Sequence, residues 1–502
     1  MRCLHKLCIA AAFLLSSFLS ASSQESRIVD FYADVISVDP SIGNGIKRMI
    51  GNVRMKHKNL TLTCDSAYLD ETINQFTGYS RVHIIKADTL HVYSRKLIYN
   101  GQTEFAQLEG NVLMDNGKES LKAPRLDYNM KEETAVYFGG GQIIDSLNIV
   151  ESFWGYYYLK LNEFIFKESV TLTNPDNTLF TDSLTYNSLT EAMSFEGPTE
   201  IFSDTNYIAC NRGKYDSKNR KSSFSQNVYM QVKQQVLRTD SLIYDQAGNF
   251  TEAFCNVVLK DTVENMIIHG EHLYYDETKN SFQITEDVLY IMAGDKDSLF
   301  LHSDTLISTR EDIRKSRRIQ AFPHVQFYRK DIQGRCDSLD YLVIDSLIQL
   351  FHDPVIWQDN NQLTADTLGI RLGKKGIERM EMRSGGFMIT QEDSTMFNQI
   401  KGKKITGFFK SDQLHRVEVT GNGESLFYPK DGDQVIGQNK AVSSTIMIYF
   451  AERKIDRIAF VTDPDSKLTP LKDLGAGDLR LEGFKWLDEK RPKTREDIRI
   501  WK

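Results

Sequence analysis

Thr181-Asp182-Ser183-Leu184-Thr185-Tyr186 is one copy of a phrase that recurs along most of the chain and decides the fold. The phrase is a small residue, a polar residue, a variable residue, leucine, a second variable residue and tyrosine. Successive copies are 29 to 33 residues apart, which indicates stacked supersecondary units rather than separate globular domains. Aligned on the small residue, the copies begin at Cys64, Ser94, Ala123, Ser152, Thr181, Cys210, Thr239, Gly270, Ser303, Cys336 and Ala365.

The composition around these copies favours strands. Short stretches of Val, Ile, Tyr, Phe and Thr are broken by Asn, Asp and Gly, and the chain has only 10 prolines and few long runs at helical period. An apolar residue stands two positions before the small residue, except at Gly334, and leucine and tyrosine follow at plus three and plus five. Residues two apart in a strand share a face, so the polar residue at plus one is expected at a bulge or corner that flips the alternation.

A second phrase precedes most copies by about 13 residues, as in Gly110-Asn111-Val112 and Gln226-Asn227-Val228. Gly and Asn tolerate the left-handed conformation that a tight turn needs, so each repeat is expected to hold two strands joined by turns. The fold predicted is all-β: an elongated β-solenoid of about eleven two-strand repeats of roughly 29 residues. Its twisted sheet would fold into a narrow sandwich or open roll with hydrogen-bonding edges free at both ends.

Three segments are expected along the chain. Residues 1–23 combine Arg2 and Lys6 with an apolar run and small residues, which is typical of a secretory signal peptide, so the mature chain is expected to be exported to the periplasm. Residues 24–400 form the repeat domain. Residues 401–502 are expected to hold degenerate β repeats and, from Lys472, a cap or tail dense in charges of both signs.

The charge balance argues against nucleic-acid binding. The chain has 61 basic and 68 acidic residues, and removal of Arg2 and Lys6 leaves 59 against 68, a net charge of about −9. A net acidic chain without a basic block is a poor partner for nucleic acid.

Cys64, Cys210 and Cys336 stand in the small-residue slot that alanine fills in other copies, which predicts small buried residues. Since their repeats are several units apart, disulfides among them are not expected. His269-x-x-His272 is the one close histidine pair of the mature chain, and strand geometry predicts that the two side chains point to opposite faces.

Other patterns also favour structure over chemistry. The repeated acids suggest a calcium array, but the dense Gly and Asp of calcium-binding solenoids are missing, which favours a turn role. Gly139-Gly140-Gly141 lacks a following Lys-Ser/Thr, and no serine-hydrolase elbow or zinc-protease motif occurs. No metal, cofactor or enzyme activity is expected. The acids in question are Asp65, Asp182, Asp240, Asp304, Asp337 and Asp366.

The leader, the Gly-Asn-Val phrase and the repeated small-Asp-x-Leu-x-Tyr phrase resemble the OstA/LptA family of lipopolysaccharide-transport proteins over roughly residues 28 to 400. Gly421-Asn422-Gly423 and residues 481–486 resemble long members of this group. The resemblance implies a β-jellyroll, or β-taco, whose apolar interior shields the acyl chains of lipid A. It also implies partners: other jellyroll components of the transport bridge and the outer-membrane translocon, joined by edge-strand pairing. The residues after the last copy are too few for the translocon's barrel.

The function expected is therefore binding and transport of lipopolysaccharide in the periplasm, either free there or associated with the outer membrane. One alternative is a closed structural or adhesive β-solenoid whose outer face binds a partner. Another is a solenoid polysaccharide-degrading enzyme, against which the regular repetition argues. The residues expected to face lipid are Leu121, Leu126, Tyr128, Leu179, Leu184, Tyr186, Leu237, Leu242 and Tyr244.

Overall fold

A computed structural model describes residues 30–502 apart from 39–42, 44, 205, 295–296, 312–315, 374–375, 411–412, 433 and 452–453. The expected signal peptide, residues 1–23, lies outside the described residues. The chain divides into two compact units, Met1–Leu161 and Asn162–Lys502. Both units consist of antiparallel β-strands, and the described helices are short 3₁₀ turns, so the expectation of an all-β protein is confirmed.

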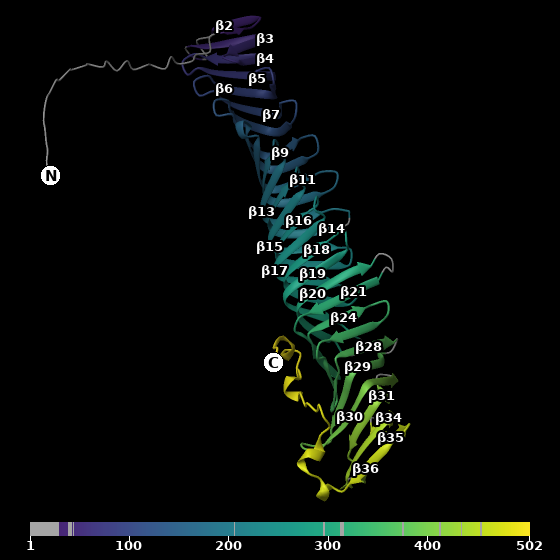
Figure 1. Cartoon of the computed structure of the whole chain (residues 1–502). Coiled ribbons are helices and arrows are strands. Elements are labelled where there is room, and N and C mark those ends of the chain that lie inside the picture. The colour runs from purple at the N-terminus through teal and green to yellow at the C-terminus, as the bar shows by residue number, and fades with distance from the viewer. Residues whose placement is uncertain are drawn as a thin grey trace, which may run out of the picture. The chain divides into compact units, whose positions relative to one another are not determined.

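The first unit is a stack of long strands in which each strand from β3 to β10 pairs with the next along the chain (Figure 1). The short strands β1 and β2 both pair with β3 and form the end of the stack. A 3₁₀ turn, η1 (Leu159–Leu161), follows the last strand. The strands are β1 (Asp30–Tyr32), β2 (Val35–Val38), β3 (Ile46–His57), β4 (Leu60–Asp70), β5 (Gln75–Lys86), β6 (Leu90–Asn100), β7 (Phe105–Asp115), β8 (Ser120–Asn129), β9 (Thr134–Ile144) and β10 (Ile149–Tyr158).

The second unit begins with the same plan. Ten long strands pair consecutively: β11 (Glu163–Thr173), β12 (Thr178–Asn187), β13 (Ala192–Phe202), β14 (Asn206–Asp216), β15 (Lys221–Val232), β16 (Gln235–Asp245), β17 (Phe250–Asp261), β18 (Met266–Asp276), β19 (Ser281–Met292) and β20 (Leu299–Glu311).

After β20 the long strands divide into two. The two halves of β20 pair with β21 (Ser316–Phe322) and β22 (Val325–Arg329), and the chain then alternates between two rows of short strands. These are β23 (Ile332–Cys336), β24 (Ser338–Leu342), β25 (Leu347–Phe351), β26 (Val355–Gln358), β27 (Asn361–Thr364) and β28 (Thr367–Gly373).

Long strands return at β29 (Gly376–Gln391), which pairs with both β27 and β28. The stack then ends with β34 paired to two short strands, β35 and β36. A two-stranded hairpin, β32 and β33, lies between β31 and β34 in the chain. The bounds are β30 (Phe397–Lys410), β31 (Gln413–Phe427), β32 (Lys430–Asp431), β33 (Gln434–Val435), β34 (Gln438–Ala451), β35 (Lys454–Val461) and β36 (Asp465–Thr469).

Each long strand bends at a corner near its middle. In the pairing of β4 with β5 the register shifts between Thr63 and Ser66, opposite Ser80 and Arg81, which both have positive φ. Burial alternates up to Cys64, and Asp65 and Ser66 are then both less buried before the alternation resumes, as expected for a corner at plus one. The corner divides each strand into a first arm, which precedes the small residue in the even-numbered strands β4 to β20, and a second arm, which follows it.

The second sequence phrase marks the same corner on the neighbouring strand. Gly110 and Asn111 have the left-handed φ values expected of them, +82° and +51°. The pair lies inside β7, however, so the expectation of a turn between two strands is wrong. A bulge inside a strand needs the same backbone conformation as a tight turn, and sequence alone does not separate the two.

A C-terminal strap, residues 470–502, lies against the first-arm row of strands in the second unit. It contains four 3₁₀ turns, η2 (Leu471–Asp473), η3 (Ala476–Leu479), η4 (Asp488–Lys490) and η5 (Asp497–Arg499), and it runs back along the strands in yellow in Figure 1. Leu481, Phe484 and Trp486 of the strap pack with Phe397 and its neighbours in a second apolar core.

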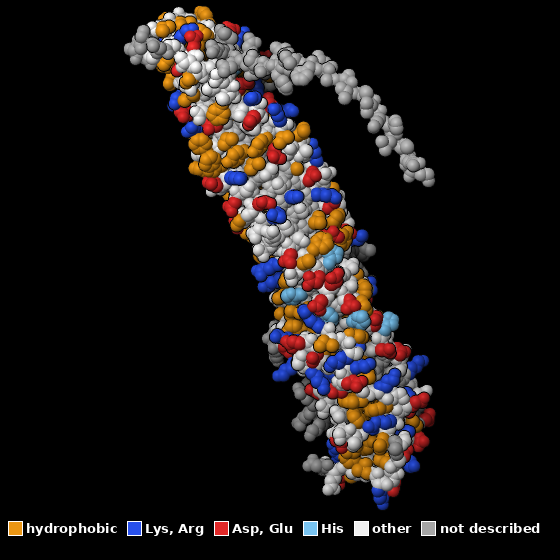
Figure 2. Space-filling view, turned by 90° about the vertical axis from the view of Figure 1, so that its left-hand side faces the viewer, with side chains coloured by type: hydrophobic (Ala, Val, Ile, Leu, Met, Phe, Trp, Pro, Cys, Tyr) orange, Lys and Arg blue, Asp and Glu red, His pale blue; other side chains and the backbone are white. Residues whose placement is uncertain are grey.

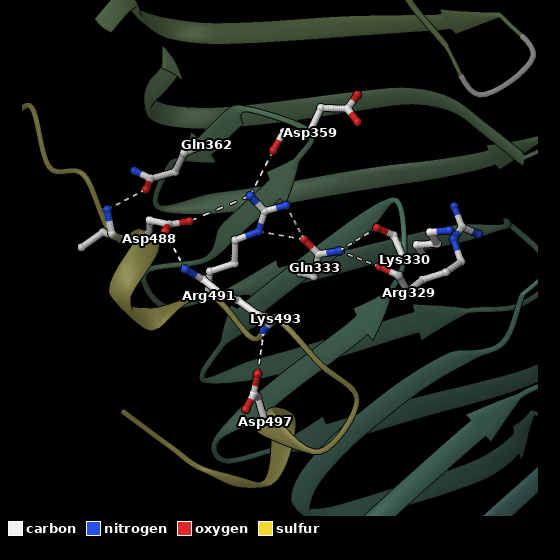
Figure 3. A network of polar contacts seen from close by, with 10 residues as sticks. Arg329, Lys330, Gln333, Asp359, Gln362, Asp488, Arg491, Lys493 and Asp497 are labelled. Carbon is white, nitrogen blue, oxygen red and sulfur yellow. Dashed lines mark hydrogen bonds and ion pairs between the residues drawn. The ribbon is translucent and has the colours of Figure 1, made fainter. Parts of the chain in front are cut away.

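Buried glutamines hold the backbone of this strap. Gln399 donates to the Leu479 carbonyl (2.9 Å) and accepts from the Leu481 amide (2.7 Å). Gln362 donates to the Lys485 carbonyl and accepts from the Leu487 amide, both at 2.7 Å. The side-chain oxygen of Gln333 accepts two hydrogen bonds from the guanidinium group of Arg491 (Figure 3). Because the glutamine amides satisfy backbone groups of an extended segment, they fix its position without a further strand pairing.

Candidate functional site

The apolar interior between the two arms is the candidate site. Eight of the nine residues expected to face lipid are buried, and Tyr244 is half-buried. Their positions at minus two, plus three and plus five lie on the side of the strands that the arms enclose, because the corner restores the alternation. The buried eight are Leu121, Leu126, Tyr128, Leu179, Leu184, Tyr186, Leu237 and Leu242.

Large aromatic side chains fit over glycines of the neighbouring strand. A β-carbon at Gly213 would overlap the ring of Phe195, and one at Gly155 would overlap the ring of Tyr137. Gly334, which breaks the apolar minus-two position, lies under the ring of Phe327 in the same way. The ring of Phe327, from the neighbouring strand, thus fills the space that an apolar side chain occupies in the other copies, and the interior stays filled.

In the first unit, polar groups join the tips of the two arms along a line that we call the seam. At the end of β3, His57 Nδ1 lies 2.7 Å from the hydroxyl of Tyr99, and the neighbouring Lys58 forms an ion pair with Glu104. His57 and Lys58 belong to the first arm, whereas Tyr99 and Glu104 belong to the second. Burial, helped by the charge of Lys58, lowers the pKa of His57.

Lys86 makes the most extensive contact across the seam. Its ammonium group donates to the Met130 carbonyl (2.8 Å), to Glu133 (3.0 Å) and to the Tyr128 hydroxyl (3.4 Å). Its side chain is only 13% exposed. One lysine at a first-arm tip therefore holds three groups of the second arm.

The tyrosine at plus five has two roles at this seam. Its ring belongs to the apolar interior and its hydroxyl reaches the polar tips, as in Tyr157, which donates to Glu119 (3.0 Å). Burial raises the pKa of Tyr99, Tyr128 and Tyr157, so these groups stay protonated at neutral pH.

The seam contacts were not predicted from the sequence. They join residues 38 to 47 positions apart in the sequence, whereas the pattern of a strand indicates only which strands are neighbours. A signal exists, because Lys58 and Glu104 are 46 residues apart and Lys86 and Glu133 are 47 apart. In the second unit one such contact recurs, between Glu264 and Arg317 (2.7 Å).

The cysteines of the small-residue slot are buried, as expected. Cys64, Cys210 and Cys336 are 6%, 4% and 2% exposed, whereas Cys255 is exposed, and all four are free thiols. Burial raises the pKa of Cys64 and of Cys210 to about 11. These thiols fill space at the corners.

The repeated acids act at corners instead of turns between strands. Asp65 forms an ion pair with Arg81, and Asp240 accepts a hydrogen bond from Asn256 (2.7 Å), in each case at the facing corner of the next strand. Asp304 contacts His324 in the same way (2.8 Å). Figure 2 shows histidine and acidic side chains close together on one face of the molecule.

His269 and His272 are both half-buried, outside the row of buried residues formed by Ile268, Gly270 and Leu273. The expectation that they point to opposite faces is wrong, because the corner between them reverses the alternation. Within the part of the chain that the structure describes, no three His, Cys, Asp or Glu side chains are grouped so as to hold a metal ion. No helix among these residues has the length and apolar character needed to cross a membrane.

The fold and the interior of each unit define a class: an antiparallel β-roll with two arms around an apolar interior. Residues 25–178 and 168–240 match the family described as OstA-like protein, so the predicted resemblance to this family is confirmed over this region. No curated protein matches the chain. Among solved structures, the chain is similar to LptH of Pseudomonas aeruginosa, described as the LptA homologous periplasmic component of the conserved lipopolysaccharide transport device. The identity is 16%, covering 27% of this chain and 96% of that one, with a TM-score of 0.21.

Proposed function

We propose that the chain binds the acyl chains of lipopolysaccharide in its apolar interior and carries them through the periplasm toward the outer membrane. The observation that carries the proposal is the row of apolar side chains on the enclosed side of successive strands, with polar groups at the corners and at the seam. The OstA-like region and the role printed for LptH support the choice of lipid and compartment.

The energetics favour a roll that parts at the seam. Burial of a chain of about 12 methylene groups contributes roughly 10 kcal/mol, at about 0.8 kcal/mol for each group. The first unit holds its interior closed with side chains such as Leu62 and Tyr128 at 0% exposure, so a lipid must separate the arms to enter it. Exposed ion pairs at the tips cost only about 0.2–1 kcal/mol each to break. Lipid binding therefore outweighs the exposed ion pairs at the tips.

The ends of the stack support the proposed partners. The outer strand β2 has four exposed residues, and Val35 and Val38 are 56% and 60% exposed. An unpaired strand edge is a template for pairing with a strand of another protein. We propose that this edge joins another jellyroll component of a transport bridge, and that β35 and β36 of the second unit face the translocon.

The test is the lipid content of the purified protein. The chain is isolated from cell envelopes without detergent and extracted lipids are analysed by mass spectrometry for lipid A. We expect lipid A with the native chain and with Thr185→Asp, whose side chain lies outside the buried row, and its loss with Leu184→Asp, confirmed as folded by circular dichroism. The absence of lipid A from the native chain would favour the closed structural solenoid.

A further inference from the structure

We propose that acyl chains enter and leave the second unit sideways, through an opening in the seam between β13 and β17. This inference rests on the proposed function and locates the entry site of the lipid. An amphiphile using it would place its alkyl chain between the arms and its anionic headgroup at the tips.

Side chains on the enclosed face become accessible in this stretch. In the first unit the corresponding side chains, such as Leu62, Val92 and Tyr99, are at most 1% exposed. Near the corners of β13 to β17 the interior is still closed by Phe195, Leu242 and other buried side chains. Toward the tips, however, the enclosed row is half-buried at Met193, Ile201, Ile208, Tyr215, Met230, Val232, Tyr244 and Leu259. The side chains near the corners are therefore buried between the arms, whereas those near the tips, which we call the mouth, are accessible to solvent.

The contacts that close the seam elsewhere are missing along this stretch. Among the described residues of the tips from 188 to 261, polar contacts run along one row of turns, as between Gln235 and Asp261 or Arg220 and Gln246, and none crosses to the other arm. Contacts that do cross lie before this stretch in the first unit and after it at Glu264 and Arg317.

A change of residue type at one turn position accounts for the difference. From β4 to β19 the last residue of each second-arm turn has positive φ. In the first unit it is Asn74 after β4, and Glu104 and Glu133 after β6 and β8, where each carboxylate is the partner of a lysine. In the stretch from β14 to β19 the same position holds Arg220, Asn249 and Asn280. Lys233 follows β15 as Lys58 follows β3, and Asn280 lies 47 residues further on, so this lysine faces an amide position where the first unit has a carboxylate.

The rim of the opening carries exposed cations beside acidic residues such as Glu191 and Asp204. Lys218, Arg220 and Lys233 are exposed at the tips that border the stretch. Lysine and arginine at the edge of an apolar groove complement a phosphorylated headgroup, while the groove takes the alkyl chain. Ser222 and Thr251 flank Tyr244, where Ala106 and Ala135 flank Tyr128 in the first unit, so hydroxyl groups replace methyl groups at this mouth.

The test is to tie the opening shut. In a Cys255→Ser background, Lys233→Cys and Asn280→Cys are joined by a short bis-maleimide linker, with the product verified by mass spectrometry. Uptake of fluorescent lipid A by the purified chain is then followed over time. The matched control is the same linker between Gln234→Cys and Thr262→Cys, which are exposed on neighbouring turns of the same arm, so that the linker does not span the opening.

We expect the linker at 233 and 280 to slow uptake about tenfold or more, as loss of a gating motion does, and the linker at 234 and 262 to leave the rate unchanged. Unchanged uptake with the 233–280 linker would overturn the side opening and leave the proposed function intact. No uptake by the unlinked chain would overturn both.

Discussion

Replacement of Lys86 by methionine tests whether the seam holds the first unit closed. Methionine keeps the apolar part of the side chain and removes the donors to Met130, Glu133 and Tyr128. Hydrogen bonds to charged groups contribute about 1.5–3 kcal/mol, while exposed ion pairs contribute less than about 1 kcal/mol. Since Lys86 is 13% exposed and Glu133 is 36% exposed, we expect a loss of about 1–3 kcal/mol in the free energy of local opening.

The assay is hydrogen exchange of the backbone amides of β8 and β9, because a repeat protein opens locally and one unfolding midpoint does not report on one seam contact. A loss of 1.4 kcal/mol corresponds to a tenfold faster exchange. Lys118→Met is the matched control, since Lys118 is exposed at the next first-arm turn. Exchange that is equally fast in Lys86→Met and the native chain would refute the reasoning. A double-mutant cycle with Glu133→Gln isolates the ion pair.

Three further predictions follow from single contacts. Burial holds the pKa of His57 below its unfolded value of about 6.5, so its contribution to stability is present above that pH and is lost as the pH falls below it. The backbone amides around Tyr99 should therefore exchange hydrogen faster at pH 5 than at pH 7.5, after correction for intrinsic rates. His57→Gln should remove this difference. Maleimide should label Cys255 quickly in the folded chain and label Cys64, Cys210 and Cys336 only on unfolding, and rapid labelling of all four would contradict their burial. Gln399→Ala should release the strap around Leu481, at a cost of about 1–3 kcal/mol, and make residues 470–502 sensitive to protease, with the exposed Gln413→Ala as control; a strap that stays protected would show that its apolar contacts suffice.

The sequence predicts much of the local structure because the repeat reports on neighbours. The position of Leu184 and Tyr186 relative to Thr181 requires a corner, and the structure has one there. The left-handed corner residues Ser80, Arg81 and Cys255 escape prediction, because they are not residue types that favour this conformation and the neighbouring strand imposes it on them.

Contacts between distant parts of the chain are beyond such a pattern. Gln399 bonds a segment about 80 residues away, and the charged composition of residues 472–502 gives no sign that a row of buried glutamines receives it. The seam is missed for the same reason, since Lys86 and Glu133 meet only after the arms have folded toward each other. The half-buried mouth between β13 and β17 is explained by turns that lack the carboxylate found in the first unit. The sequence alone does not show that this turn position matters, because its partner across the seam is seen only in the folded structure.

Photocrosslinking in living cells tests the central claim most directly. A photoreactive amino acid is placed in turn at Leu126, Leu184 and Leu242, which are buried on the enclosed face, and at Lys122 and Thr185, which are not. The account predicts crosslinks to lipopolysaccharide from the three leucine positions and none from the two controls. The absence of crosslinks at all three positions, in protein shown to be folded and exported, would contradict the account and favour a closed structural roll.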